Sequence, residues 1–154
     1  MAETILVSAC LLGLTTRYDG KAAANEKVLA YLRRNQAIAI PVCPEQLAGL
    51  PTPRPRCWFA NGDGATLLSG TGRLENENGE DVSSFFLDGA RQCLTIAQLV
   101  RANRAILKER SPSCGSHQVY LGQEKVDGQG VTAALLKQHN VVICSDEDFD
   151  EENF

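Results

Sequence analysis

Four short apolar runs rich in β-branched and aliphatic residues are spaced along the chain, and they constrain its fold more than any other feature. They read ETILVSA (residues 3–9), AIAIPV (37–42), RAILKE (104–109) and VVICSDED (141–148). Runs of this length and composition predict buried β-strands. Segments with helical character separate them, and parallel strands need such long crossovers. The alternation therefore predicts an α/β fold: a mostly parallel, Rossmann-like sheet with helices packed on it.

Three segments carry helix signals. Asn25 can cap a helix over residues 26–35, and an apolar stripe at three- to four-residue spacing predicts a helix over residues 81–102. Residues 128–140, GQGVTAALLKQHN, predict a helix with glycines at its start. These helices account for the crossovers that a parallel sheet requires.

The region between the second strand and the long helix is expected to be irregular. Residues 43–64 include prolines at 44, 51, 53 and 55, which excludes a continuous helix or a central strand and predicts a long functional loop. Residues 65–81 predict a small hairpin. A length of 154 residues with 44% hydrophobic residues fits a single domain over residues 1–154.

The net charge and the lack of long apolar runs argue against some classes of function. The formal net charge is -4, which argues against a general basic field for nucleic acid and favours a small-molecule partner. The sequence has no run of 18 apolar residues, so no transmembrane helix is expected, and the first residues do not resemble a secretion signal. We therefore expect a cytoplasmic protein whose six cysteines stay reduced. Metal ligation or catalysis is then the expected role of some of these cysteines.

Three of the cysteines stand just past the end of a predicted strand. Cys10, Cys43 and Cys114 occupy these positions, and the carboxyl ends of parallel strands meet at one edge of a sheet. Three converging thiolates suit zinc or an iron–sulfur cluster. A four-iron cluster held by only three cysteines keeps one iron open for substrate. The spacing matches no common ligand signature, so it does not choose among these possibilities.

The other cysteines have different expected roles. Cys93 lies on the apolar helix stripe and is expected in the core. Cys57, beside Trp58, is either a packed or an exposed thiol. Cys144 also ends a strand and is either a core residue, which we favour, or a fourth cluster ligand. A fourth ligand would close the cluster and favour electron transfer or a structural role. Neither a P-loop nor a dinucleotide fingerprint is present, so no nucleotide cofactor is expected.

Longer motifs give a more specific indication. ILVSACLLG with RYDGK, PVCPEQLAGLPTPRP, ILKERSPSCG and GQGVTAALL resemble the iron–sulfur desulfidase family that includes the 2-thiouracil desulfidases. The resemblance runs in order from Ile5 to about Cys144 and covers nearly the whole chain. Its motifs are long and unusual. One departure is Thr16, which stands where many relatives carry a cysteine before RYDG.

The resemblance implies a [4Fe-4S] cluster held by Cys10, Cys43 and Cys114, with one iron not ligated by protein. That soft iron would take the sulfur of a thiolated pyrimidine such as 2-thiouracil, and water would replace the sulfur to give the oxo base and sulfide. Glu45 would transfer protons, and a serine of the third motif, Ser111 or Ser113, would take part as well.

Residues of the RYDG motif, Arg17, Tyr18 and Asp19, are expected to line the substrate pocket, although Asp19-Gly20 is also a favourable turn. The expected partner is a thiolated base or nucleoside, not a membrane or a nucleic acid. Two other readings stay open on the residues alone. One is a non-catalytic iron–sulfur protein with Cys144 as the fourth ligand, and the other is a zinc protein.

Overall fold

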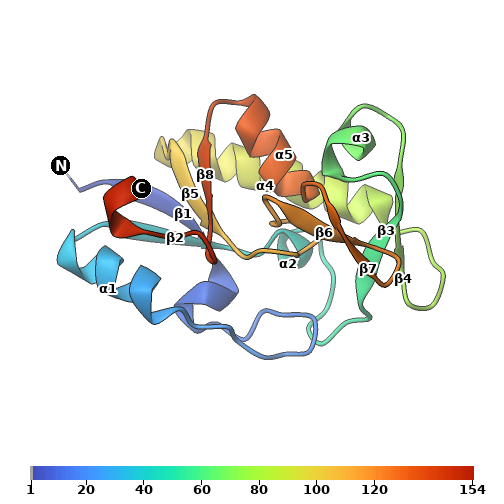
Figure 1. The fold of residues 1–154 in the computed structure, drawn as a ribbon, viewed down its shortest axis with the longest axis horizontal. Helices are drawn as coiled ribbons and strands as arrows, with labels where there is room; N and C mark the ends of the chain where they lie inside the picture. The colour runs from blue at the N-terminus through green and yellow to red at the C-terminus, as the bar shows by residue number, and fades with distance from the viewer. Residues whose placement is uncertain (1) are drawn as a thin grey trace.

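A computed structural model describes residues 2–154 and shows two four-stranded sheets. The first sheet has the order β2-β1-β5-β8, and every neighbouring pair in it is parallel. Its strands are β1 (Thr4–Ser8), β2 (Ile38–Val42), β5 (Arg104–Leu107) and β8 (Val142–Ser145). The four strands predicted from the apolar runs, and the predicted parallel sheet, are confirmed (Figure 1).

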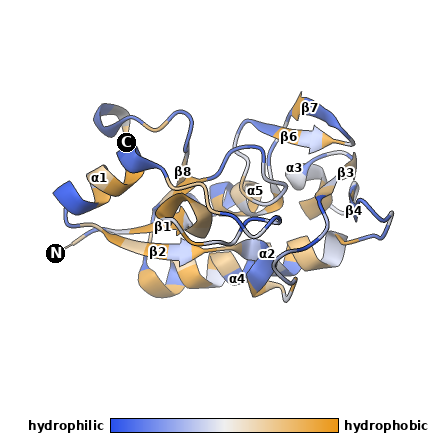
Figure 2. Cartoon of the chain, turned by 90° about the horizontal axis from the view of Figure 1, so that it is seen from below, coloured by the Kyte–Doolittle hydropathy of each residue, from blue (hydrophilic) through white to orange (hydrophobic). Residues whose placement is uncertain are grey.

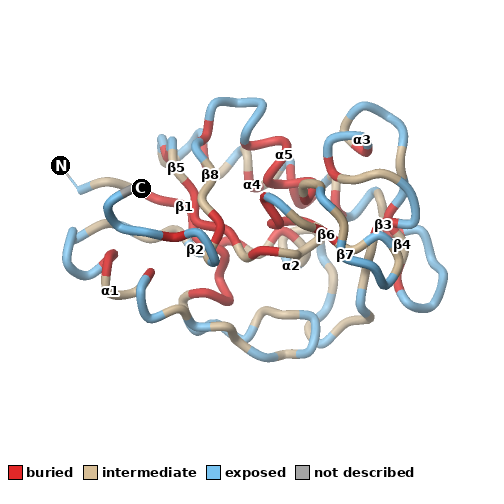
Figure 3. Tube along the Cα trace, viewed as in Figure 1, coloured by how far each residue is buried: buried red, intermediate tan, exposed pale blue. Residues whose placement is uncertain are grey.

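Helices cover both faces of this sheet. Alternate residues of β1 point to opposite faces, so Leu6 packs with α4 (Ser83–Val100) and α5 (Val131–Gln138), whereas Ile5 and Val7 pack with α1 (Glu26–Arg34). The buried segments coloured red in Figure 3 include β1 and most of α5. The three predicted helices are confirmed, with ends that differ from the predicted ones by a few residues. Burial on both faces explains why the strands are apolar throughout.

The second sheet has the order β4-β3-β6-β7 and was not predicted. It contains β3 (Cys57–Asn61), β4 (Arg73–Asn76), β6 (Gln118–Leu121) and β7 (Glu124–Asp127). β3 pairs antiparallel with β4 and parallel with β6, and β6 and β7 form a hairpin. The hairpin is largely hydrophilic in Figure 2, whereas α4 shows long apolar stretches. Fully buried Phe59 and Val119 contribute the apolar side of this sheet to a core shared with α4 and α5.

Two predictions for the middle of the chain were wrong in part. The small hairpin expected over residues 65–81 is confined to their end, where Glu75 and Asp81 form an isolated antiparallel bridge around a tight turn. The start is instead occupied by α3 (Gly64–Leu68), with Asp63 and Thr66 forming a capping box, and β4 pairs with β3. The proline-rich stretch is not simply a loop, because it contains the one-turn helix α2 (Pro44–Leu47) and leads into β3, a central strand. The prolines precede Cys57, so β3 keeps its backbone donors.

The carboxyl ends of β1, β2 and β5 face the second sheet and carry the segments that build the site. β1 continues into the 3-10 helix η1 (Ala9–Leu12), β2 into α2, and β5 into the loop 108–117. A second 3-10 helix, η2 (Glu151–Asn153), lies near the end of the chain. Among residues 2–154, no helix combines the length and apolar character needed to cross a membrane.

Candidate active site

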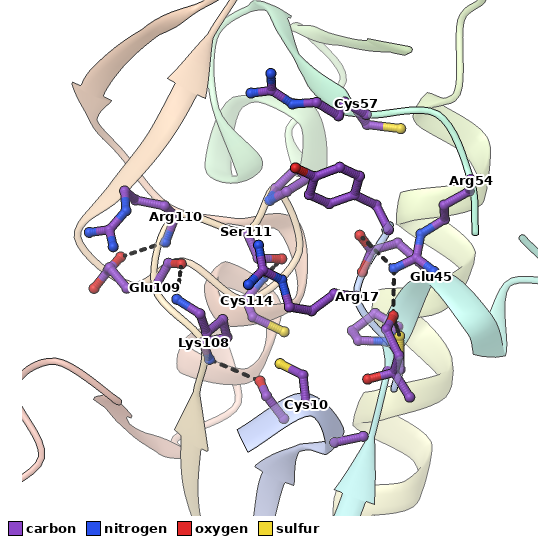
Figure 4. A pocket seen from close by; sticks show the side chains of 18 of the residues that line it. Cys10, Arg17, Glu45, Arg54, Cys57, Lys108, Glu109, Arg110, Ser111 and Cys114 are labelled. Carbon is purple, nitrogen blue, oxygen red and sulfur yellow. Dashed lines mark hydrogen bonds and ion pairs between the residues drawn. The ribbon is translucent and has the colours of Figure 1, made fainter. Parts of the chain in front are cut away.

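One cavity of about 380 Å³ lies beyond the carboxyl ends of the parallel strands. Its walls come from η1, the loop 16–18, α2, the proline-rich segment and the loop that follows β5, with Tyr120 of β6 added from the second sheet. Figure 4 shows side chains from these separate segments pointing toward one space. The cavity lies at the edge of an open α/β sheet where ligands are expected to bind.

All three cysteines predicted as ligands line this cavity. Cys10 lies in η1, Cys43 is the N-cap of α2, and Cys114 lies in the loop after β5. The sulfur atoms of Cys10 and Cys114 face each other across a small gap in Figure 4. The thiols also interact electrostatically, since Cys43 raises the pKa of Cys10 and Cys10 raises that of Cys114. The fold thus gathers residues from three distant parts of the chain.

Burial controls the protonation of these thiols. Desolvation raises the pKa of Cys10 to about 11, and it raises the pKa values of Cys43 and Cys114 as well. The ammonium of Lys108 opposes the shift at Cys10. The three thiols are therefore neutral at pH 7 by themselves, and they would lose their protons on binding a metal centre, as thiolate ligands must.

The donor set fits an iron–sulfur cluster better than a single metal ion. Within residues 2–154, no three His, Cys, Asp or Glu side chains are grouped closely enough to hold one ion. A four-iron cluster places each cysteine on a different iron, so its ligands stand farther apart than those of a zinc ion. Cys10, Cys43 and Cys114 come to one cavity from three strand ends, and Cys57 lines the same cavity.

The loop that carries Cys114 is folded around a buried carboxylate. Glu109 is only 4% exposed, and it accepts hydrogen bonds from the backbone N–H groups of Arg110, Ser116, His117 and Gln118 and from the Ser116 hydroxyl. Burial by itself would raise the pKa of this carboxyl, but the backbone donors outweigh it and lower the pKa to about 2. The ionised side chain therefore shapes the loop.

A serine completes the local geometry at Cys114. The Ser111 hydroxyl oxygen accepts the N–H groups of Ser113 and Cys114, each at 3.1 Å. Gly130 lies so close to this turn that a Cβ there would stand 2.4 Å from the Ser113 carbonyl carbon. The SPSCG segment is thus fixed from both sides, and its serines have different positions: Ser111 lines the cavity, whereas Ser113 is fully buried behind it.

Glu45 lies in the cavity wall, in the first turn of α2. The Ser113 hydroxyl donates to one carboxylate oxygen of Glu45 at 3.1 Å, and the guanidinium of Arg54 lies 3.7 Å from the other. The structure therefore places Glu45 next to Ser113, one of the two candidate serines of the third motif. It also separates the serines, because Ser113 contacts Glu45 and Ser111 supports the Cys114 turn.

The cavity lining holds more basic than acidic side chains, although the whole chain is acidic. Five basic side chains line it, namely Arg17, Arg54, Arg56, Lys108 and Arg110, against the carboxylates of Glu45 and Glu109. Three of the five also pair with carboxylates outside the lining: Arg17 with Asp19, Lys108 with Asp146 and Arg110 with Glu147. The guanidinium carbons of Arg17 and Arg56 each lie 5.9 Å from the centre of the Tyr18 ring. Such a lining offsets the negative charge of three thiolates and their cluster, and it favours an anionic ligand.

Asp19, the other three cysteines and His117 have different surroundings. Asp19 is not among the lining residues and instead accepts the Lys21 N–H in an exposed turn. Cys93 is fully buried in the core, as predicted, and Cys144 packs against the core on the α1 side of the sheet. Cys57 lines the cavity, but Figure 4 shows it far from Cys10 and Cys114. His117 pairs with Asp148 at 2.5 Å.

Comparison with known proteins identifies the family. The chain matches the 2-thiouracil desulfurase family over residues 5–148. It is 41% identical over 150 residues to the uncharacterized protein YbbK of Bacillus subtilis (strain 168), covering 96% of this chain and 98% of YbbK. It is also similar to the solved structure of the [4Fe-4S]-dependent thiouracil desulfidase TudS. That match has a TM-score of 0.76 and 36% identity, over 94% of this chain and 91% of the other. This chain therefore belongs to the 2-thiouracil desulfurase family.

Proposed function

We propose that this protein is a [4Fe-4S]-dependent desulfidase that converts a thiolated pyrimidine to its oxo form. The overall change is hydrolytic: the C=S group and one water give C=O and hydrogen sulfide, with no electron donor or acceptor. The observation that carries the proposal is the placement of three thiols from three strand ends around one cavity, next to Glu45. The membership of a desulfurase family and the likeness to TudS support it.

Cys10, Cys43 and Cys114 would hold the cluster. When bound, the cluster supplies a soft Lewis acid with one iron free of protein ligands, which suits the sulfur of a thiocarbonyl group. The cationic lining stabilises the charge that accumulates on three thiolates and on the departing sulfide. Closure of the cavity floor by buried Ser8 and Cys114 keeps bulk water away from that side.

Glu45 is the group placed to move protons. Its carboxylate reaches the cavity, and one of its oxygens accepts the Ser113 hydroxyl. In the proposed reaction Glu45 takes a proton from the attacking water and later returns one to the ring nitrogen or to the leaving sulfide. Ser113 donates to Glu45 and so orients it from the buried side.

Ser111 has a different proposed role. Its hydroxyl oxygen already accepts two backbone N–H groups, so its own O–H remains available as a donor toward the cavity. A pyrimidine ring carbonyl is a suitable acceptor. Arg17 and Tyr18 line the mouth and would contact the rest of the substrate, whereas Asp19 would hold the turn that carries them.

The test is anaerobic reconstitution with iron and sulfide, followed by incubation with 2-thiouracil, 4-thiouridine and a thiouridine monophosphate. We expect brown protein with about four irons per chain, and sulfide and the oxo base released in equal amounts from at least one substrate. Glu45→Gln should keep its iron and lose turnover. Brown protein that releases no sulfide from any of the three would refute the enzyme and favour a non-catalytic cluster protein. Colourless protein that retains zinc would refute the cluster.

A further inference from the structure

Arg54 is a buried cation in a segment that otherwise looks like a solvated loop. Its side chain is only 5% exposed, although it lies between Pro53 and Pro55. A buried guanidinium requires several hydrogen-bond acceptors to offset the loss of water. The reaction proposed above does not use Arg54 directly, so its burial needs another explanation.

The contacts of Arg54 join three segments of the site. Its Nη2 donates to the Thr16 carbonyl at 2.9 Å and lies 3.7 Å from Glu45, while Nη1 donates to the Thr52 hydroxyl at 3.0 Å. Its backbone N–H also donates to the Tyr18 carbonyl at 2.8 Å. One side chain thus ties the loop bearing Arg17 and Tyr18 to the helix that bears Glu45.

The Thr16 carbonyl accepts two donors, the Arg54 guanidinium at 2.9 Å and the Cys43 thiol at 3.7 Å. A charged guanidinium is a strong donor and a thiol is a weak one. Among the described residues, loss of Arg54 would therefore leave this carbonyl with the weak thiol donor alone.

We propose that Arg54 is a positioning residue, which rests on the proposed function: it orients Glu45 and fixes the loop 14–20 over the cluster cavity. The planar fork of a guanidinium allows this, because it can serve Thr16, Thr52 and Glu45 at the same time. A lysine at this position keeps the charge near Glu45 but cannot reach all three partners. Arg54→Lys keeps the charge and loses the planar guanidinium, whereas Arg54→Gln loses both. Comparing the two variants therefore separates the effect of the charge from that of the guanidinium shape.

The first test is a double-mutant cycle in kcat with anaerobically loaded protein. Arg54→Gln should lower kcat about tenfold while iron content and the visible spectrum stay normal, and Arg54→Lys should recover part of that loss. Because Glu45→Gln is expected to lose turnover, the background for the cycle is Glu45→Asp, whose shorter carboxylate leaves the reach of Arg54. There the same Arg54→Gln change should lower kcat less than about twofold, because the contact between Arg54 and residue 45 is already lost.

The second test uses cluster-free protein and no activity. Trypsin cuts after Arg17 and Lys21 only when the loop opens, so Arg54→Gln should speed that cleavage about tenfold. Arg73→Lys, a change at an exposed arginine on β4, should behave like wild type in both tests.

Three outcomes would overturn the proposal while wild type remains active. In the first, the fold-changes in kcat from the Arg54 and Glu45 substitutions multiply, so the two residues act independently. In the second, only KM rises, by the same factor in both backgrounds, which would make Arg54 a substrate contact. In the third, Arg54→Gln leaves the rate of loop cleavage unchanged, which would show that the contact with Thr16 does not hold the loop. By contrast, cluster-loaded wild type that releases no sulfide would refute the proposed function itself. The cleavage assay needs no activity, so it would still test whether Arg54 holds the loop through Thr16.

Discussion

Replacing Glu109 by glutamine tests whether a buried charge folds the loop that carries Cys114. Glutamine has the same shape but no charge, so it mimics the protonated carboxyl. Lowering the pKa from 4.5 to about 2 means that folding favours the ionised form. At about 1.4 kcal/mol per pKa unit, the ionised form contributes about 3 kcal/mol to the free energy of folding at pH 7.

The sign of the pH dependence follows from the lowered pKa. The stabilisation is fully present above pH 4.5, where the carboxyl is ionised even in the unfolded chain, and it is lost as the pH falls toward 2. The difference between wild type and Glu109→Gln should therefore shrink from about 3 kcal/mol at pH 7 to about 1.5 kcal/mol at pH 3. Urea unfolding of the cluster-free, reduced protein measures both values.

With a urea m-value of about 2 kcal/mol per molar, Glu109→Gln should lower the midpoint at pH 7 by about 1.5 M. Glu124→Gln is the matched control, because Glu124 is exposed on β7. It should shift the midpoint by less than about 0.25 M. A Glu109→Gln midpoint equal to that control, or a difference that does not shrink between pH 7 and pH 3, would show that the carboxylate does not organise the loop.

The remaining predictions concern the cavity. Cys114→Ser should abolish stable cluster binding, measured as iron per chain after reconstitution, whereas Cys144→Ser should load normally; loss of iron in Cys144→Ser would indicate a fourth ligand. Ser113→Ala should lower kcat about tenfold and leave iron content unchanged, because Glu45 loses the hydroxyl donor at 3.1 Å. A normal kcat would show that Ser113 does not contribute to catalysis. Arg56→Gln should raise KM at least about tenfold for a thiouridine monophosphate but not for 2-thiouracil, because the guanidinium lines the cavity and would pair with a substrate phosphate; equal changes for both would refute that pairing.

The parallel sheet was predictable because each of its strands has a strong local signal. Runs such as ILV at residues 5–7 are apolar on both faces, as strands covered by helices on both sides must be. The rule that ligands bind beyond the carboxyl ends of such strands then placed the three thiols at one edge. That the thiols of Cys10, Cys43 and Cys114 share a cavity follows from topology and needs no knowledge of side-chain contacts.

The second sheet was not predicted because its signals are weak or ambiguous. β3 follows three prolines, and β4 has one apolar residue, Leu74, among polar ones, so neither resembles a buried strand in isolation. The β6–β7 hairpin did have a usable signal: strand-forming QVYL and EKVD flank Gly122-Gln123, with Gly122 at φ 61°. The pairing of β3 with β6 depends on contacts between distant segments, which a local pattern does not specify.

Parts of the site also depended on tertiary structure. Arg54 looked like a surface arginine among prolines, and only the folded chain shows its guanidinium against Glu45 and Thr16. Glu109 gave no sign in the sequence that its carboxylate would collect backbone donors from residues 116–118. In both cases the partners come from loops whose paths the sequence pattern leaves undefined.

The separation of the three thiols along the chain has a consequence for biogenesis. Intervals of 33 and 71 residues lie between Cys10, Cys43 and Cys114, so no short peptide contains the whole ligand set. A cluster on these three thiols would therefore not nucleate folding as zinc does in a small finger, because its ligands come together only when β1, β2 and β5 are aligned. Iron retention would then report on the whole parallel sheet, and substitutions far from any sulfur should appear first as pale, poorly loaded protein.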